Sequence, residues 1–200
     1  MNRKINLVVG AAMIAFATTS LKAQKQNMTP ELLWELGRVS GESISPDGTS
    51  LYYGVTMYDV EENKGNRDLY KIPVNGGKAV KITEMEGSES GVQFHPDGKK
   101  IGFIHGGQWW EAGLDGSNPV QITEIERGIS GLKYSPDGKK VLYTTEVKID
   151  KTLSEEYPNL PMADAKIMDD LMYRHWDHWE DEYRSHVFIA DYSNGKIITL

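Results

Sequence analysis

Short apolar runs recur along this 200-residue chain, and each run directly follows the same polar turn. The turns are Ser45–Gly48, His95–Gly98 and Ser135–Gly138, and all three contain Pro-Asp-Gly. Proline presets φ at the second turn position, Asp bonds back to the backbone, and Gly accepts the last position of a type I turn or the left-handed site after it. The turns are separated by 50 and then 40 residues, a period typical of blades or solenoids.

Each repeat contains four strand-like runs. The first run ends at the Pro-Asp-Gly turn, and the second run follows it. The third and fourth runs are joined by a Gly-bearing turn, such as Asn75–Gly77 or Asp115–Ser117, which supplies the positive φ of a tight hairpin. Four antiparallel strands repeated at this period describe a propeller blade. The pattern therefore predicts an all-β fold, a partial β-propeller of about three four-stranded blades over residues 38–84, 85–124 and 125–200.

Two segments lie outside the repeat. Residues 24–37 form a lead-in that contains a predicted helix, because Thr29 is a good N-cap, Pro30 suits the first helical position and Gly37 is a stop signal. The third blade carries a long insertion over residues 147–184. Its second half has apolar and aromatic residues at three- and four-residue spacing, which predicts an amphipathic helical insertion. These residues are Met168, Leu171, Met172, His175, Trp179 and Tyr183.

Residues 1–23 have the pattern of a secretory signal peptide, with a basic start, a short apolar run and a predicted cleavage after Ala23. Export to a periplasm fits the absence of cysteine, which also excludes disulfides and thiolate metal sites. Without the leader the chain keeps 19 Lys and Arg against 29 Asp and Glu. This acidic balance argues against nucleic acid or an anionic membrane as partner.

No catalytic constellation is present in the sequence. A serine hydrolase needs a Gly-x-Ser-x-Gly elbow, and neither this elbow nor a phosphate-binding glycine loop occurs. We therefore expect no catalytic residue, no cofactor and no metal in these 200 residues. Three blades do not close a propeller, so we also expect this sequence to be the N-terminal part of a longer protein, or a protomer that obtains its missing blades from another chain.

The densest chemistry lies in Tyr173–Arg184, for which three interpretations compete. His175, Asp177 and His178 offer metal-ligating atoms, but positions i and i+2 diverge on a helix and no second cluster completes the shell. A simpler interpretation is an amphipathic surface helix with a solvated acidic face and its Trp residues in the core.

The third interpretation is an anionic site for a substrate amine, built from Glu180, Glu182 and Asp177 with aromatic side chains beside it. The geometry decides which carboxylates converge. Glu180 and Glu182 face the same way only where the chain is extended, whereas on a continuing helix Asp177 would pair with Glu180 or Asp181.

The repeat motif with its Asn75–Thr83 closing run resembles the propeller repeats of two groups, the prolyl oligopeptidase family of serine peptidases and the Tol-system periplasmic propeller. The lead-in Met28–Val39 and the insertion motif Tyr173–Asp177 favour the first, since they are similar to secreted dipeptidyl- and acylaminoacyl-peptidases. The resemblance covers essentially the whole chain after the leader.

The resemblance implies that the propeller gates a C-terminal α/β-hydrolase domain, which carries a Ser-Asp-His triad and lies outside these residues. In that case the partners are short peptide substrates, the missing blades and the hydrolase domain of the same polypeptide. Acidic residues from a propeller insertion bind the substrate's free amine in some dipeptidyl members, and Trp179–Tyr183 resembles such a segment. The alternative function is a non-enzymatic periplasmic propeller, similar to the Tol-system protein, that binds protein partners.

Overall fold

The computed structural model describes residues 27–163, 165–169, 171–193 and 195–198. The predicted signal peptide, residues 1–23, lies outside the described residues. The described residues belong to two units, one that ends at Leu33 and one that begins at Trp34. The predicted N-terminal helix is present as α2 (Pro30–Glu35), and the Thr29 hydroxyl caps it by accepting the Leu32 amide at 3.2 Å. Over the described part of the chain, no helix has the length and apolar character needed to span a membrane.

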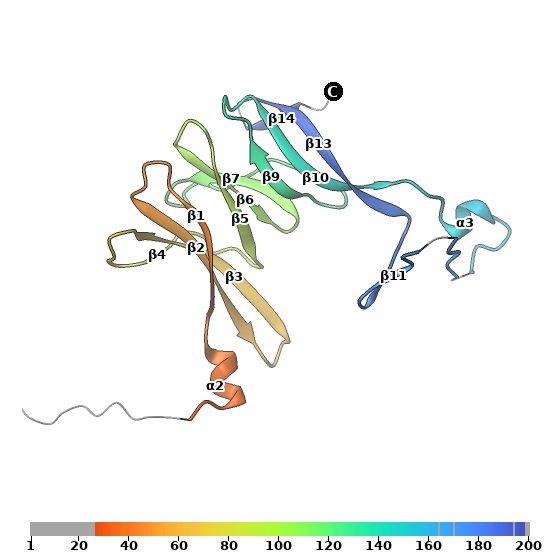
Figure 1. The fold of residues 1–200 in the computed structure, drawn as a ribbon, viewed down its shortest axis with the longest axis horizontal. Helices are drawn as coiled ribbons and strands as arrows, with labels where there is room; N and C mark the ends of the chain where they lie inside the picture. Colours follow the sequence, from red (N-terminus) through yellow and green to blue (C-terminus); the bar gives the residue numbers. More distant parts are fainter. Residues whose placement is uncertain (1–26, 164, 170, 194, 199–200) are drawn as a thin grey trace, which may run out of the picture. The chain divides into compact units, whose positions relative to one another are not determined.

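The described residues form three four-stranded antiparallel sheets, each of which corresponds to one predicted blade (Figure 1). Blade 1 contains β1 (Arg38–Ile44), β2 (Ser50–Asp59), β3 (Lys64–Pro73) and β4 (Val80–Lys81). Blade 2 contains β5 (Glu89–Phe94), β6 (Lys100–His105), β7 (Gln108–Gly113) and β8 (Val120–Gln121). Blade 3 contains β9 (Ser130–Tyr134), β10 (Lys140–Lys148), β13 (Tyr183–Ser193) and β14 (Lys196–Ile198). The predicted fold class, a partial β-propeller, is confirmed.

The Pro-Asp-Gly turns join the first two strands of each blade, as the sequence predicts. In the first turn, the Gly48 amide donates to the Ser45 carbonyl at 2.8 Å and Gly48 has φ +70°. The other two turns repeat this bond at 2.9 Å with φ of 70° and 68° at glycine. Hydrogen bonds from the Ser45 hydroxyl and from Thr49 lower the pKa of Asp47 to about 2. The turn is thus a structural element, in which the carboxylate accepts hydrogen bonds from neighbouring residues of the same turn.

The hydrophobic core lies between successive blades. Side chains of blades 1 and 2 form one cluster, which contains Tyr52, Leu69, Ile82, Val92, Ile101, Phe103 and Ala112. Trp109 of blade 2 packs with blade 3 in a second cluster, together with Ile129, Leu132, Val141, Tyr143, Ala190 and Tyr192. Each fully buried large side chain contributes roughly 1.5–3 kcal/mol. Inter-blade packing is therefore the main source of stability, as in other repeat folds.

The insertion leaves blade 3 where β10 and β13 stop pairing, at the Lys148–Tyr183 pair. Its first part contains the four-residue helix α3 (Leu153–Glu156), which begins with a capping box. The Thr152 hydroxyl accepts the Glu155 amide at 3.3 Å, and the Glu155 carboxylate accepts the Thr152 amide at 2.8 Å. A hydrogen bond from Lys148, together with this backbone bond, lowers the pKa of Glu155 to about 2. A helix therefore exists in the insertion, but it is short and precedes the segment in which we predicted it.

The amphipathic helix predicted over Met168–Tyr183 is wrong, because a β-hairpin occupies this segment. Its strands are β11 (Arg174–His175) and β12 (His178–Trp179), which pair residue for residue. The connecting turn contains Trp176 with φ +53°, a left-handed conformation that ends any helix. The three- and four-residue spacing of aromatic positions, which indicated a helix, arises here from residues on either side of a hairpin turn.

Candidate functional site

The acidic segment that follows the hairpin is not helical and is fixed at both ends by backbone hydrogen bonds. The Glu180 amide donates to the Tyr173 carbonyl at 3.0 Å and so continues the hairpin ladder. The Glu182 carbonyl accepts the Ile149 amide at 2.9 Å, where the chain leaves blade 3. Of the two geometries left open by the sequence, the continuing helix is absent, and Glu180, Asp181 and Glu182 all line one cavity.

These carboxylates line an open cavity of about 570 Å³ within the insertion. The cavity is acidic, because six of its described lining residues carry carboxylates and three carry basic groups. The acidic lining residues are Asp150, Glu156, Asp169, Glu180, Asp181 and Glu182, and the basic ones are Lys151, Lys166 and Arg184. A cavity of this charge favours a cationic ligand.

The three consecutive carboxylates of this segment differ in their partners. Asp181 Oδ2 forms an ion pair with Arg127 Nη2 at 3.2 Å. Glu180 Oε2 lies 3.7 Å from Arg184 Nη1, a longer and weaker pair. Among the described residues, no Lys, Arg or His nitrogen lies within 4.0 Å of the Glu182 carboxylate. Of these three carboxylates, Glu182 is therefore the one most available to an incoming cation.

Arg127 holds the acidic segment against the blade, and sequence reasoning missed it. Its Nε pairs with Glu146 on β10, its Nη2 reaches Asp181, and its guanidinium lies 3.8 Å from the centre of the Tyr183 ring. Arg127 belongs to the loop between β8 and β9, and 54 residues separate it from Asp181. No local sequence pattern indicates the Arg127–Asp181 contact. The blade period is the one signal that suggests it, because this period places the loop of Arg127 beside β10.

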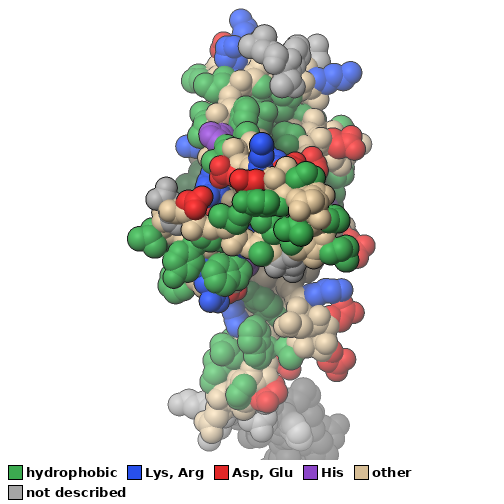
Figure 2. Space-filling view, turned by 90° about the vertical axis from the view of Figure 1, so that its right-hand side faces the viewer, with side chains coloured by type: hydrophobic (Ala, Val, Ile, Leu, Met, Phe, Trp, Pro, Cys, Tyr) green, Lys and Arg blue, Asp and Glu red, His purple; other side chains and the backbone are tan. Residues whose placement is uncertain are grey.

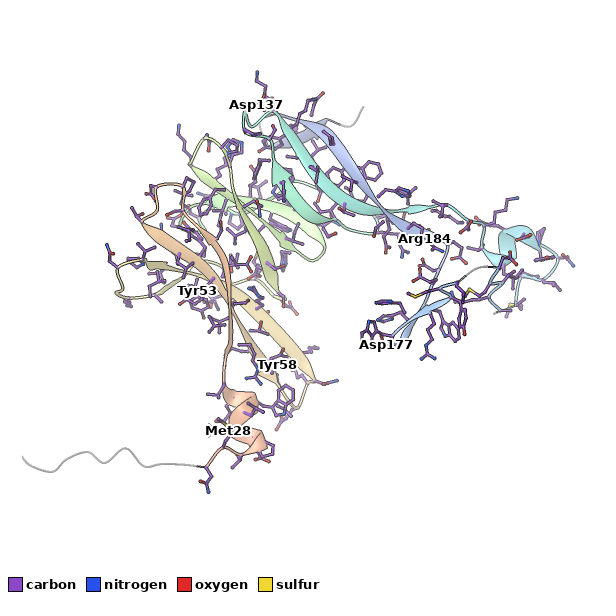
Figure 3. All side chains as sticks on the ribbon, in the orientation of Figure 1. Met28, Tyr53, Tyr58, Asp137, Asp177 and Arg184 are labelled. Carbon is purple, nitrogen blue, oxygen red and sulfur yellow. The ribbon has the colours of Figure 1, made fainter. Side chains whose placement is uncertain are left out.

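Asp177, the third predicted amine-binding residue, does not line the cavity. It lies in the hairpin turn with its side chain 81% exposed, and Figure 3 shows it at the opposite end of the hairpin from Arg184. Its carboxylate Oδ1 lies 3.1 Å from His178 Nε2. Within the described residues, no three His, Asp or Glu side chains form a group that could hold a metal ion.

Comparison with known proteins relates the whole chain to peptidases. Dipeptidyl-peptidase 5 of Porphyromonas gingivalis is 38% identical over 206 residues, which cover 100% of this chain and 30% of the relative. Dipeptidyl-peptidase 5 of Porphyromonas endodontalis is 32% identical over 183 residues, which cover 90% of this chain and 26% of the relative. The chain thus spans about a third or less of the length of these relatives. No family model matches it.

Solved structures show the same fold. Acylaminoacyl peptidase of Pyrococcus horikoshii has a TM-score of 0.62 at 17% identity, over 84% of this chain and 25% of that one. The isopeptidase AtxE2 has a TM-score of 0.60 at 14% identity, over 88% of this chain and 32% of that one. The fold is therefore that of the propeller portion of such peptidases. The predicted resemblance to the prolyl oligopeptidase family is confirmed, because the chain is homologous to part of dipeptidyl-peptidases.

Proposed function

We propose that this chain is the substrate-gating propeller portion of an exported serine exopeptidase that releases dipeptides from the free N-terminus of short peptides. The observation that carries the proposal is the 38% identity to a dipeptidyl-peptidase along the entire chain. The nucleophile, acid and base belong to an α/β-hydrolase domain of the same polypeptide in this proposal, since the present sequence contains no nucleophile elbow. Export rests on the leader pattern of residues 1–23.

The part played by these residues is to recognise the substrate's α-ammonium group. Glu182 supplies a carboxylate that has no ion-pair partner within 4.0 Å among the described residues, and Glu180 lines the same cavity. An ammonium between two carboxylates gains charge-assisted hydrogen bonds in a partly enclosed site, where the effective dielectric constant is below that of water. Binding the amine at a fixed distance from the nucleophile places the second peptide bond in the catalytic site. The enzyme then releases a dipeptide and no longer fragment.

Arg184 offsets part of the negative charge of Glu180 in the unliganded state. Its Nη1 lies 3.7 Å from Glu180 and donates to the Asp181 and Tyr183 carbonyls. The guanidinium is thus fixed by backbone acceptors and does not need the Glu180 carboxylate to stay in place. An ammonium that enters the cavity competes with Arg184 for Glu180, whereas at Glu182 no Lys, Arg or His nitrogen of the described residues lies within 4.0 Å.

The test is a substitution of Glu182 by glutamine in the full-length protein, with a free-amine dipeptide substrate and its N-acetylated counterpart. Loss of one such ion pair costs about 1.4 kcal/mol, which corresponds to a roughly tenfold higher KM for the free-amine substrate. The matched control is Asp177→Asn, which removes an equally charged group that lies outside the cavity. It should leave both substrates unchanged.

Two results would contradict the proposal. Equal effects of Glu182→Gln on the free and acetylated substrates would remove the amine-binding role of this residue. The absence of any peptide hydrolysis by the full-length protein would remove the peptidase assignment itself.

A further inference from the structure

Thioether side chains line the acidic cavity beside its carboxylates. Met168 and Met172 are among the lining residues, and Met172 also lines an adjoining depression of about 670 Å³. Figure 3 shows sulfur atoms within the insertion, and Figure 2, which faces the side of the molecule that carries the insertion, shows hydrophobic side chains beside acidic ones. Because the sequence contains no cysteine, methionine is the sulfur-containing residue of this chain.

The segment that carries these methionines, residues 165–172, forms one wall of the cavity without regular secondary structure. Its described residues, 165–169 and 171–172, make no hydrogen bond or ion pair with other described residues. Its apolar residues line the cavity, namely Ala165, Ile167, Met168, Leu171 and Met172. Apolar packing is therefore the stabilising interaction that remains for this wall.

Solvent reaches the thioether of Met172. Met172 is 61% exposed and Met168 is 37% exposed, whereas Met85 is partly buried against the core between blades 1 and 2. Met162 is 93% exposed but does not line the cavity. An oxidant in solution attacks an exposed sulfur more readily than a buried one. Met172 thus combines access to solvent with a place in a wall that depends on apolar packing.

We propose that Met172 is a site of reversible oxidation by peroxide, and that its sulfoxide loosens the wall of the acidic cavity. In this reaction the Met172 sulfur attacks one oxygen of hydrogen peroxide and the O–O bond breaks. The sulfur gains one oxygen and loses two electrons, and the peroxide is reduced to one water molecule. The sulfoxide is polar, and its oxygen is unfavourable on an apolar surface unless it accepts a hydrogen bond. The oxidised side chain therefore turns toward water, and the wall loses a packing contact.

The first measurement identifies the oxidised sites in the full-length protein. The protein is treated with increasing concentrations of hydrogen peroxide, and the sulfoxide at each methionine is quantified by peptide mass spectrometry. Met162 and Met172 should be oxidised at lower peroxide concentrations than Met85, because they are more exposed. Methionine sulfoxide reductases A and B, one for each sulfoxide epimer, should together restore the Met172 thioether.

The second measurement follows the wall itself, without a substrate. Trypsin cleaves after Lys166, which lies in the wall segment. Oxidation should accelerate this cleavage, and Met172→Gln, which introduces a polar amide at the same position, should accelerate it without peroxide. Met162→Leu is the matched control, because Met162 lies outside the cavity. Its cleavage after Lys166 should respond to peroxide as the wild-type protein does.

The effect of oxidation on catalysis rests on the proposed function, in which the cavity binds the substrate amine. KM for the free-amine dipeptide substrate should rise about fivefold on oxidation, with little change in kcat, because the polar oxygen disfavours the packed wall. The ratio of KM after and before peroxide treatment should fall close to one in Met172→Leu, which has no sulfur at this position. Treatment with the two reductases should return the wild-type KM to its starting value.

Two results would overturn the inference. One is oxidation of Met172 at no lower peroxide concentration than Met85. The other is an unchanged rate of cleavage after Lys166 in protein whose Met172 is fully converted to the sulfoxide. Failure of the proposed function gives a different pattern. The requirement for a free amine is then missing, while the oxidation map and the trypsin result remain as expected.

Discussion

The buried carboxylate of Glu89 makes the contact between blades 1 and 2 sensitive to pH. Glu89 begins β5 and is 0% exposed. Its Oε2 accepts the Thr83 hydroxyl at 2.7 Å, and the Thr83 Oγ1 in turn accepts the Leu69 amide of β3 at 2.8 Å. Among the described residues, its Oε1 has no hydrogen-bond partner, and it lies 3.4 Å from His105 Nδ1. Glu89 therefore links the edge of one blade to the start of the next.

Burial disfavours the charged form and raises the pKa of Glu89 from 4.5 to about 7, although the Thr83 hydrogen bond and the charges of Lys81 and Arg67 oppose this. The folded state thus binds the proton more tightly than the unfolded state. The stability of this contact is full below pH 4.5, falls as the pH rises toward 7, and is lowest above pH 7. Ionisation of Glu89 in the folded state therefore lowers the stability by at most about 3 kcal/mol, and screening reduces this loss to about 2 kcal/mol.

Glu89→Gln removes the ionisable group and keeps an oxygen that accepts the Thr83 hydroxyl. Hydrogen exchange of peptides that cover β3 reports on this contact, because the Leu69 amide is the last donor in the chain of bonds. After correction for intrinsic exchange, the opening free energy of β3 in the wild-type protein should fall by about 2 kcal/mol between pH 5 and 8. In the variant it should change by less than about 0.5 kcal/mol.

Glu62→Gln is the control, since Glu62 is solvent-exposed and pairs with Lys64 on the surface. It should leave the pH dependence of β3 at the wild-type value. The same pH slope in Glu89→Gln as in the wild-type protein would refute the reasoning, and so would a variant that is less stable than the wild type at pH 8.

Two further predictions concern contacts that hold blade 3 and the acidic segment. Arg127→Gln breaks the ion pairs with Glu146 and Asp181, which are partly exposed, so KM for free-amine substrates should rise about two- to fivefold with little change in kcat. Arg127→Lys should restore part of the loss, and an effect on kcat alone would speak against a positioning role. Tyr192→Phe removes the hydroxyl that donates to the buried Glu111 carboxylate at 2.6 Å, and hydrogen exchange of β13 should show a loss of about 1.5–3 kcal/mol. No change in β13 would mean that the remaining Tyr134 bond to Glu111, at 2.7 Å, suffices.

The blade architecture could be predicted from the sequence because its signals are local. A Pro-Asp-Gly turn needs only four residues to define its geometry, and three copies at one period define a repeat. The inward positions of the strands, such as Tyr52, Leu69 and Trp109, are buried as the alternation of a strand requires.

The insertion could not be predicted equally well, because its conformation depends on its ends. Its residues must leave β10 at Lys148 and return to β13 at Tyr183. A helix that continued to Tyr183 would prevent β13 from starting there, so the pairing of blade 3 overrides the helical spacing. The sequence gives no signal for the left-handed conformation at Trp176, because no glycine lies at or beside this position.

The candidate site was predictable in part. The sequence alone selects Glu180 and Glu182 as candidate site residues, and both line the acidic cavity, whereas their convergence on one ligand stays a prediction. The exclusion of Asp177 from the cavity follows from its place in the hairpin turn, and the contact of Arg127 with Asp181 joins segments that are distant in sequence. Both depend on tertiary structure, which residue spacing does not encode.

The central claim is that this chain is part of a dipeptidyl-peptidase and binds the free α-amine of the peptide substrate. It is tested most directly by incubating the full-length protein with a short peptide and with its N-acetylated form, and by identifying the products by mass spectrometry. The account predicts release of the N-terminal dipeptide from the free peptide and no cleavage of the acetylated one. Equal cleavage of both peptides, or cleavage of neither, would contradict it.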